Sequence, residues 1–545
     1  MEADPNVATG KAVVAGEVSE TCTQWFHRGI GGGTHAQGNR RNTGSPERWL
    51  GVTSQPDARE GQAGSLGVAE GPVRPTKPGN AGGGKGPWFK ATQDAAKTRR
   101  LEMILAPPES VQKLQTALRA KAKGAPNYRF YLLYDKLYRK DVLTYAYQRC
   151  KANKGAPGID GQEFADIEAY GEERWLGELA DILRRKTYRA EAVRRVWIPK
   201  AGGSNKLRPL GIPRIADRVV MTATTVVLES IFEVDMPAEQ HGYRPNLSAH
   251  TAVRSVDRLI NGGHSRIIEA DLADYFGSIP HAELLKSVAR RVSDRHVLHL
   301  IKMWLQAPVE EDDGRGGKRR TTTAKDTGRG VPQGAPISPL LANLYMRRLV
   351  LGWKKRGLET RLGAKIVVYA DDFVICCRGN AEQAMAEMRR LITQLKLTVN
   401  EAKTHIRQLP QERFDFLGHT FGRYYSPKTG RAYLCAQPSK KSVKRIIGKI
   451  REATERRALW LDAETMVKRL NRVLVGWANY YSLGPVHSAY RAIDRYTPVR
   501  LRRWLCNKHK IANTGARCFP YEHLHDTLGL VQLRSLVHSL PSAKA

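Results

Sequence analysis

Cysteine pairs and long apolar runs are both missing from this sequence. The seven cysteines lie at positions 22, 150, 376, 377, 435, 506 and 518, and no two have the CxxC spacing of a metal site. Their odd number and scatter favour a reducing compartment, so we expect a cytoplasmic protein. No apolar run approaches the ~20 residues that a membrane-spanning helix needs, and no secretory signal segment opens the chain. We therefore expect no membrane partner.

Acidic residues are too few to balance the basic ones. The chain of 545 residues has 89 Lys and Arg against 53 Asp and Glu, which gives a formal net charge of +36 and a pI near 10.0. A surplus of this size favours a polyanionic partner. A membrane surface is the rival to nucleic acid, and the absence of a spanning run favours nucleic acid.

Sustained periodicity is missing from the first 86 residues, which hold 18 of the 49 glycines. Such a segment cannot bury enough apolar surface to offset the entropy lost on ordering. We expect residues 1–95 to form a Gly-rich, largely disordered extension. The alternative is a small domain anchored by Trp25-Phe26 and Trp49-Leu50.

Two adjacent carboxylates, in Tyr369-Ala370-Asp371-Asp372, stand between the apolar runs Ile366-Val367-Val368 and Phe373-Val374-Ile375. The β-branched runs predict two strands, and the acidic pair then occupies the tip of a hairpin. Adjacent carboxylates repel, and they are costly to bury unless a cation lies between them. Mg²⁺ suits such a site, although an acidic pair alone also fits a solvated turn.

A third carboxylate favours the metal site over the solvated turn. Asp271 ends the predicted strand Ile267-Ile268-Glu269-Ala270, and Phe276 follows where the chain leaves it. One aspartate from a strand and two from a hairpin are typical of a polymerase palm, and here the chain resembles the reverse transcriptases. The segments that carry the likeness lie in the order of that family: Ile198-Pro199-Lys200, Lys206-Leu207-Arg208-Pro209-Leu210-Gly211-Ile212-Pro213, Gly242-Tyr243-Arg244-Pro245, Gly330-Val331-Pro332-Gln333-Gly334, Leu397-Thr398-Val399-Asn400-Glu401-Ala402-Lys403-Thr404 and Phe414-Asp415-Phe416-Leu417-Gly418.

Two further segments narrow the resemblance to the bacterial-type reverse transcriptases and maturases encoded by group II introns. Asn153-Lys154-Gly155-Ala156-Pro157-Gly158-Ile159-Asp160-Gly161 is similar to their extra N-terminal block, and Gly476-Trp477-Ala478-Asn479-Tyr480-Tyr481 is similar to their maturase region. Gly277 departs from the family, because an acid is common there.

The resemblance implies an α+β right-hand polymerase followed by an all-helical region. Its implied divisions are fingers over 96–245, a ferredoxin-like palm over 246–438, a helical thumb or maturase region over 439–512, and a short tail over 513–545. Within the palm, the spacing of Met385, Met388, Leu391, Ile392 and Leu395 predicts an amphipathic helix over 383–395 that faces the core.

The resemblance also implies the roles of the site residues. Asp271, Asp371 and Asp372 would hold two Mg²⁺ ions. Lys200 and Arg208 would clamp the triphosphate, with Lys206 competing for the role of Lys200, and Gln333 would line the nucleotide pocket. Phe276 would exclude a 2′-hydroxyl, its alternative being a plain core aromatic. Lys403 would protonate pyrophosphate, its alternative being a solvated lysine.

The region 439–512 is strongly basic, with 18 Lys and Arg against 5 Asp and Glu. Val467, Leu470, Leu474, Trp477 and Tyr481 follow helical spacing and predict a packing stripe. Lys468, Arg469 and Arg472 lie off that stripe, and we expect them to contact RNA phosphates. The 33 residues after Ala512 hold His523 and His525, which we expect in a solvated loop, and we expect no endonuclease in so short a tail.

The function that the resemblance implies is RNA-directed DNA polymerisation, splicing of the bound intron RNA and retrohoming by target-primed reverse transcription. The partners would be group II intron RNA, target DNA and dNTPs, with the protein joining the nucleoid when it acts on DNA. The alternatives are an RNA-binding splicing factor without catalysis and a reverse transcriptase of defence or retron type.

Overall fold

The N-terminal helices of the described chain pack around one apolar helix, α8 (Ile215–Phe232). The computed structural model describes residues 106–199, 207–313, 317–426 and 429–536, so the predicted N-terminal extension lies outside it. Helix α8 is apolar almost all round and is buried along most of its length, as a helix without a polar face must be. It packs against α3, α4 and α5 and, from later in the chain, α14 (Ser338–Lys355). The helices of this part are α3 (Glu109–Gly124), α4 (Tyr134–Leu137), α5 (Lys140–Ala152), α6 (Phe164–Tyr170), α7 (Glu172–Arg184) and α8 (Ile215–Phe232).

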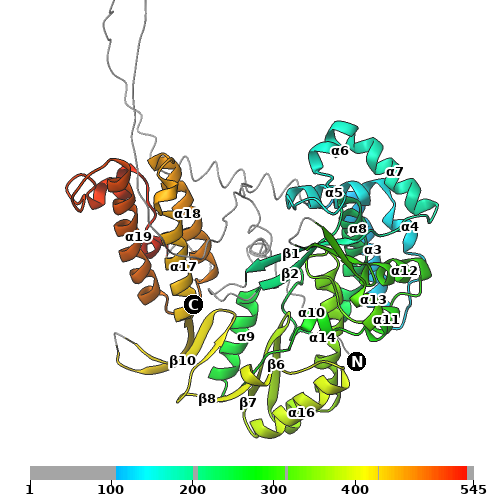
Figure 1. Cartoon of the computed structure of the whole chain (residues 1–545). Helices are drawn as coiled ribbons and strands as arrows, with labels where there is room; N and C mark the ends of the chain where they lie inside the picture. The colour runs from blue at the N-terminus through cyan, green and yellow to red at the C-terminus, as the bar shows by residue number, and fades with distance from the viewer. Residues whose placement is uncertain (1–105, 200–206, 314–316, 427–428, 537–545) are drawn as a thin grey trace, which may run out of the picture. The chain divides into compact units, whose positions relative to one another are not determined.

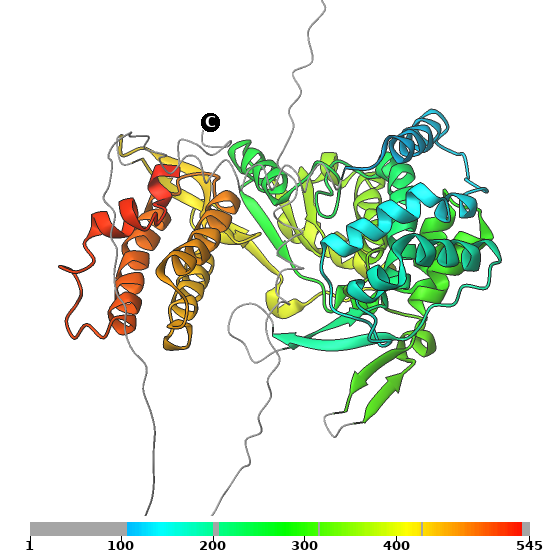
Figure 2. The ribbon, with the colours of Figure 1, turned by 90° about the horizontal axis from the view of Figure 1, so that it is seen from above.

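An N-terminal sheet with the strand order β2-β1-β4-β5 adjoins these helices. The strands β1 (Val193–Pro199) and β2 (Leu207–Ile212) pair antiparallel, and β4 (Val309–Asp312) joins β1 in parallel register at Val193↔Val309. Strand β5 (Lys318–Thr321) completes a hairpin with β4, which Figure 2 shows in green. The segment 309–321 therefore belongs to the sheet of the preceding part, although it falls within the chain range expected for the palm.

A central sheet with the order β6-β7-β3-β8 forms the next part. Its strands are antiparallel: β3 (Arg266–Ala270), β6 (Ala364–Tyr369), β7 (Asp372–Cys377) and β8 (His405–Gln408). Successive side chains of a strand point to opposite faces. Ile268, Ile366 and Ile375 accordingly lie in the main core, whereas Val367 and Cys376 lie in a second cluster.

Helices cover both faces of the central sheet. Helix α9 (Ala249–Asn261) contributes Val253, Val256 and Ile260 to the second cluster, and α14 (Ser338–Lys355) and α16 (Ala381–Gln394) contribute to the main core (Figure 1). Because both faces are covered, Cys376 and Cys377 are fully buried. The prediction of a core-facing helix near 383–395 is confirmed, since Met385, Met388, Leu391 and Ile392 are buried on α16.

Shorter elements connect these strands and helices. They are the 3₁₀ turns η1 (Glu233–Asp235) and η2 (Glu401–Lys403), and the helices α10 (Tyr275–Ser278), α11 (His281–Ala289), α12 (Arg295–Leu305), α13 (Thr323–Thr327) and α15 (Leu358–Arg361). A small sheet of order β11-β10-β9 follows, built from β9 (Phe414–Phe416), β10 (His419–Tyr425) and β11 (Ala432–Pro438).

The C-terminal helical region comprises the described residues 440–536. Its elements are α17 (Lys440–Ala453), η3 (Arg456–Ala458), α18 (Ala463–Tyr480), α19 (His487–Lys508), the π-helical turn η4 (His523–Thr527) and α20 (Leu533–Leu536). The predicted packing stripe is confirmed, because Val467, Leu470, Leu474, Trp477 and Tyr481 are all buried. None of the described helices is long and apolar enough to span a membrane.

The described part of the tail packs onto this region. Leu524, Leu530 and Leu533 are buried in the same core as α17–α19, and Asn471 of α18 holds the backbone at Gly529 (Nδ2 to O, 2.8 Å). The prediction of a solvated loop at His523 and His525 is therefore wrong. Both histidines lie in the π-helical turn, where the His525 Nδ1 lies 2.6 Å from the Leu530 carbonyl oxygen. The burial of neighbouring leucines orders this turn.

Candidate active site

The central sheet brings the three predicted carboxylates together. Tyr369 pairs with Asp372, so Ala370 and Asp371 form the tip of a tight hairpin in which Ala370 has a φ of 58°. Ala270 pairs with Phe373 on the neighbouring strand, and Asp271 follows Ala270 directly. Extending this register by one residue places Asp271 opposite Asp372.

Desolvation and the repulsion between neighbouring carboxylates raise the pKa values of Asp371 and Asp372. The Asp371 and Asp372 side chains have solvent-accessible surface, yet the protein surrounds both closely enough to weaken their hydration. This desolvation, with the nearby Asp271 charge, raises the pKa of Asp371 above its ordinary value. Desolvation and the charges of Asp371 and Asp271 raise the pKa of Asp372 to about 7. The site therefore has more negative charge than its own cations balance.

Asp271 is held by the segment that follows α16. The Asn400 Nδ2 donates to the Asp271 Oδ2 at 2.8 Å, and the Lys403 Nζ lies 3.0 Å from the same oxygen. The backbone N–H of Asn400 also donates to the Asp271 carbonyl oxygen (2.8 Å). Lys403, predicted to act on pyrophosphate, thus pairs with a predicted metal ligand here. The sequence prediction missed Asn400, although it lies in a quoted family segment.

The donor set fits Mg²⁺ through its chemistry. Over the described ranges, no three His, Cys, Asp or Glu side chains are close enough to hold a metal by themselves. Mg²⁺ usually takes only one or two carboxylates and completes its octahedron with water and substrate phosphates. Asp271, Asp371 and Asp372 can offer one or two carboxylates to each ion, and the raised pKa values of Asp371 and Asp372 favour a nearby cation.

The hairpin tip is supported from behind by the segment 239–242. The Val368 N–H donates to the Glu239 carbonyl and the His241 N–H to the Val368 carbonyl, each at 2.8 Å. Gly242 then passes so close to the Ala370 backbone that any Cβ there would collide with the Ala370 nitrogen.

Asn343 of α14 fixes this supporting segment. The Asn343 Nδ2 donates to the Gly242 carbonyl oxygen at 2.6 Å, and the backbone carbonyl oxygen of Asn343 accepts from the Gln240 Nε2 at 3.1 Å. The sequence prediction missed Gln240 and Asn343 as support for the hairpin. An Asn within the apolar run Leu340, Leu341, Ala342 and Leu344 was the available signal, because buried amides require partners.

Phe276 lies in α10, directly after the Asp271 segment. Its carbonyl oxygen accepts from the Val331 N–H at 2.7 Å, and its partly buried ring packs against the main core. The carboxyl group of Asp274 fills the space beside Gly277, so a side chain at position 277 would require Asp274 to take another rotamer.

The predicted nucleotide residues Arg208 and Gln333 lie on two segments that touch. The Gly211 N–H of β2 donates to the Gln333 carbonyl at 2.6 Å, and a Cβ on Gly334 would lie 2.5 Å from the Gly211 oxygen. Arg208 lies on the same strand, opposite Ile198, and is half-buried. Lys200 and Lys206 lie outside the described residues.

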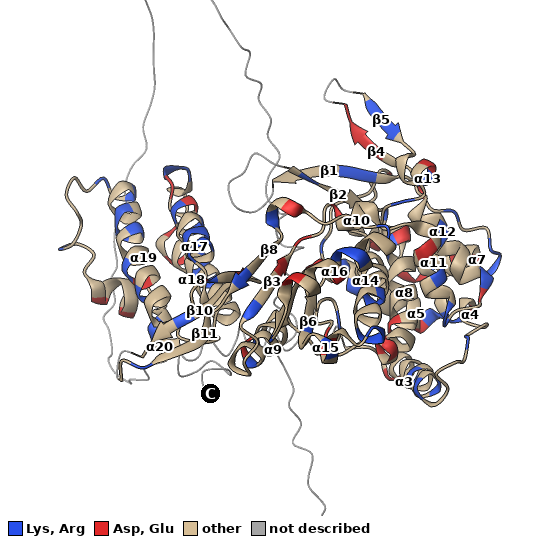
Figure 3. Ribbon diagram, turned by 90° about the horizontal axis from the view of Figure 1, so that it is seen from below, with Lys and Arg blue, Asp and Glu red and all other residues tan. Residues whose placement is uncertain are grey.

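The predicted RNA contacts Lys468, Arg469 and Arg472 are exposed on α18. The Lys468 Nζ pairs with Glu464 one helical turn earlier, at 2.9 Å. Figure 3 shows further Lys and Arg along α17 and α19 of the same region.

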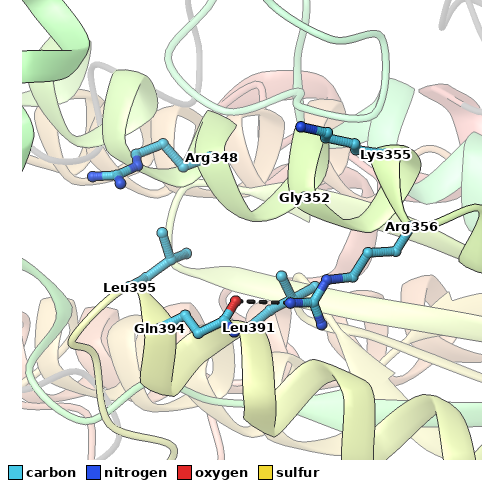
Figure 4. Close-up of a pocket in the computed structure, with 7 residues that line it drawn as sticks. All are labelled: Arg348, Gly352, Lys355, Arg356, Leu391, Gln394 and Leu395. Atoms are coloured by element: carbon cyan, nitrogen blue, oxygen red, sulfur yellow. Dashed lines mark hydrogen bonds between the residues drawn. The ribbon is translucent and has the colours of Figure 1, made fainter.

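A shallow hollow between α14 and α16 is separate from these residues. Figure 4 shows Arg356 there, donating through its Nη2 to the Gln394 Oε1 at 2.8 Å. None of the predicted site residues lines it; the lining residues are Arg348, Gly352, Lys355, Arg356, Leu391, Gln394 and Leu395.

Two sequence profiles match the chain. Residues 198–421 match the reverse transcriptase (RNA-dependent DNA polymerase) family, and residues 443–519 match the group II intron, maturase-specific domain. The first match contains the three carboxylates, and the second contains the exposed cations of α18.

Several known proteins are similar in sequence to this chain. Protein YkfC of Escherichia coli (strain K12) is 32% identical over 346 residues, which cover 57% of this chain and 87% of the relative. The group II intron-encoded protein LtrA of Lactococcus lactis subsp. cremoris is 34% identical over 220 residues, covering 40% of this chain and 35% of LtrA. The putative COX1/OXI3 intron 1 protein of Saccharomyces cerevisiae is 27% identical over 332 residues, covering 51% of this chain and 38% of that protein. With a reverse transcriptase domain followed by a maturase-specific helical domain, this chain belongs to the family of group II intron-encoded reverse transcriptases and maturases.

Proposed function

We propose that this protein copies RNA into DNA, promotes splicing of the group II intron RNA that it binds, and acts in retrohoming by target-primed reverse transcription. The observation that carries the proposal is the meeting of Asp271, Asp371 and Asp372 at the ends of adjacent strands. Intron RNA, target DNA and dNTPs are the proposed partners. The basic surplus of the chain fits these polyanions.

In this proposal, the structural parts correspond to the subdomains of a right-hand polymerase. The N-terminal helices with the N-terminal sheet are the fingers, the central sheet with its helices is the palm, and the C-terminal helical region is the thumb. The contact between β2 and the Gln333 segment supports a position of the fingers beside the nucleotide pocket.

Asp271, Asp371 and Asp372 would hold two Mg²⁺ ions, which when bound would lower the pKa of the primer 3′-hydroxyl and balance the triphosphate charge. Arg208, with Lys200, would bind phosphate oxygens, since a guanidinium suits them bidentately. Phe276 would leave no space for a 2′-hydroxyl, and Gln333 would line the pocket. Lys403 would leave Asp271 and donate a proton to the departing pyrophosphate.

The splicing role is assigned to the exposed cations Lys468, Arg469 and Arg472. They would bind phosphates without reading the sequence and hold the intron in its active fold. The protein itself would neither cut nor join the RNA in this step.

Primer extension on an RNA template tests the polymerase proposal. Asp371→Ala should lower dNTP incorporation by at least roughly 10³-fold, because the metal ions contribute several kcal/mol to the transition state. Affinity for intron RNA should stay near that of the wild type. Asp312→Ala, which removes an exposed carboxylate from β4, is the matched control and should extend normally. Wild-type extension by Asp371→Ala would refute the assignment and favour a splicing factor without catalysis.

A further inference from the structure

The side chain of Trp460 is the most exposed of the large apolar side chains in the described residues, at 80% of its full surface. It lies in the turn between α17 and α18, flanked by the buried residues Ala458 and Leu461. Single exposed apolar residues are common on protein surfaces. Trp460 differs from them in how firmly its turn is built and in what surrounds it.

The backbone on each side of Trp460 is fixed within the turn. Before it, the 3₁₀ turn η3 is closed by the Ala458 N–H, which donates to the Glu455 carbonyl at 3.0 Å. The Leu461 N–H donates to the Ala458 carbonyl at 3.2 Å, directly across Trp460. After it, the Asp462 carboxylate caps α18 by accepting from the Thr465 N–H at 2.7 Å.

Helix α19 clamps the same turn from the side. The Lys508 Nζ donates to the carbonyl of Leu459, the residue before Trp460, at 2.9 Å. The Arg500 Nε donates to the Thr454 Oγ1 at 3.1 Å, where α17 ends. The indole is thus displayed from a backbone that is already ordered, so a ligand that stacks on it loses little conformational entropy of the protein.

Two arginines, Arg456 and Arg457, precede Trp460 in the same connection between α17 and α18. Arg456 is exposed and forms no ion pair with any residue that the structure describes. Arg457 is paired with Glu455 (3.1 Å) and Glu452 (3.4 Å), so Arg456 is the cation of this turn that is open to an anion. An exposed ring and an unpaired guanidinium four residues apart in one short connection match the chemistry of a nucleotide, which has a flat base next to a phosphate. A protein partner would require a wider apolar patch than one ring.

We propose that Trp460 stacks on an unpaired base of a single-stranded nucleic acid while Arg456 contacts the adjacent phosphate. This inference rests on the proposed function and extends it, because it assigns a binding site for unpaired intron RNA or single-stranded target DNA. Binding at this site does not depend on polymerisation. Stacking on an aromatic side chain is tolerant of sequence, since every base has a flat face. This site would therefore select for unpaired strands and not for a particular base.

The test is binding of short oligoadenylates, as RNA and as DNA, to the full chain, with the polymerase site saturated by a blunt RNA–DNA duplex. Trp460→Ala should weaken binding by roughly 5- to 150-fold, which is the usual range for loss of one stacked base. Trp460→Phe should keep most of the affinity, because a ring remains. Val499→Ala, which trims another exposed apolar side chain of the same region, should bind as the wild type.

Two further measurements separate stacking from a change in structure. Abasic oligomers of the same length should bind wild type and Trp460→Ala equally, since no base is left to stack. Binding of oligoadenylate should quench part of the tryptophan fluorescence of the wild type. This quenching should be absent in Trp460→Phe. The RNA and DNA arms identify which strand is preferred. Equal oligoadenylate binding by wild type and Trp460→Ala would overturn the proposal, whereas loss of primer extension with intact stacking would count only against the polymerase function.

Discussion

Phe276 shows how much of the proposed specificity depends on one side chain. Its backbone is fixed by Val331, and its ring is only partly buried, so the ring can both pack on the core and face the nucleotide. The two roles differ in what a truncation does. A purely packing ring affects stability, whereas a gate affects the choice between ribose and deoxyribose.

We expect Phe276→Ala to raise the ratio of rNTP to dNTP incorporation by roughly 10- to 100-fold, the range that small steric differences in a pocket produce. Phe276→Tyr keeps the bulk and is the control, with a ratio close to that of the wild type. The measurement is single-nucleotide extension with each substrate. An unchanged ratio in Phe276→Ala would leave the ring with a packing role only.

At the scale of elements, the acidic hairpin of β6 and β7 depends on a close contact between two backbones. Gly242 lies against Ala370, and Asn343 fixes Gly242 from α14. Because a Cβ at position 242 would meet backbone and not a flexible side chain, the hairpin tip would have to move. Position 242 therefore ties the geometry of the carboxylates to the main core.

Gly242→Ala should destabilise the protein by about 1–3 kcal/mol, as overpacking does, and should lower kcat more than it raises KM. Gly177→Ala is the matched control, because Gly177 lies in α7 with open space around it, and it should stabilise by about 0.4–1 kcal/mol. Denaturant melts and steady-state extension measure both effects. If Gly242→Ala is as active as Gly177→Ala, the contact does not position the hairpin.

Buried histidines connect the small sheet with the elements beside it. His419 of β10 is fully buried, with its ring 5.0 Å from that of Tyr481 and 5.9 Å from that of Tyr480. Burial and, to a smaller extent, the neighbouring His250 of α9 lower the pKa of His419 to about 4, against the opposing effect of the hydrogen bond to the Leu417 carbonyl. The unfolded chain takes up this proton near the ordinary pKa of 6.5, well before the folded chain does.

Stability from His419 is therefore complete above about pH 6.5 and is lost as the pH falls toward 4. The full shift corresponds to about 3 kcal/mol. Denaturant midpoints across this range should fall less steeply with decreasing pH in His419→Phe than in the wild type. Parallel curves for the two proteins would show that His419 does not titrate on unfolding.

The whole molecule is a polycation, so its proposed affinity for intron RNA should fall as the salt concentration rises. The C-terminal helical region carries part of that charge, and Lys468, Arg469 and Arg472 present it on the exposed side of α18. Phosphate contacts release counterions, so each one adds about 0.7–0.9 to the slope of log affinity against log salt.

Arg469→Glu with Arg472→Glu should reduce the salt slope for intron RNA by about 2 and weaken binding uniformly across sequences. Arg174→Glu with Arg184→Glu changes the net charge equally on the exposed face of α7 and should leave the slope nearly unchanged. Filter binding over a salt series measures both. Equal slopes for the two double variants would mean that total charge, and not α18, controls the affinity.

Local patterns in the sequence were sufficient for several elements. The β-branched runs on both sides of Asp371 predicted the hairpin. Such residues favour strands, and the side chains of a strand alternate between its two faces whichever elements cover those faces. The spacing of Met385, Met388 and Leu391 predicted α16 for the same kind of reason. Hydrophobic periodicity indicates whether a segment is a helix or a strand and which of its faces is buried. It does not indicate which other segment packs against that face.

The tertiary structure decided the contacts between distant segments. Asn400 meets Asp271 across 129 positions, Gly242 meets Ala370, and the β4–β5 hairpin joins β1. No periodicity encodes such meetings, since each depends on strand pairing that only the folded core selects. The sequence by itself thus determined the family and the three carboxylates. The fold decided which amides and glycines hold those carboxylates, because close contact and hydrogen bonding exist only once the chain is packed.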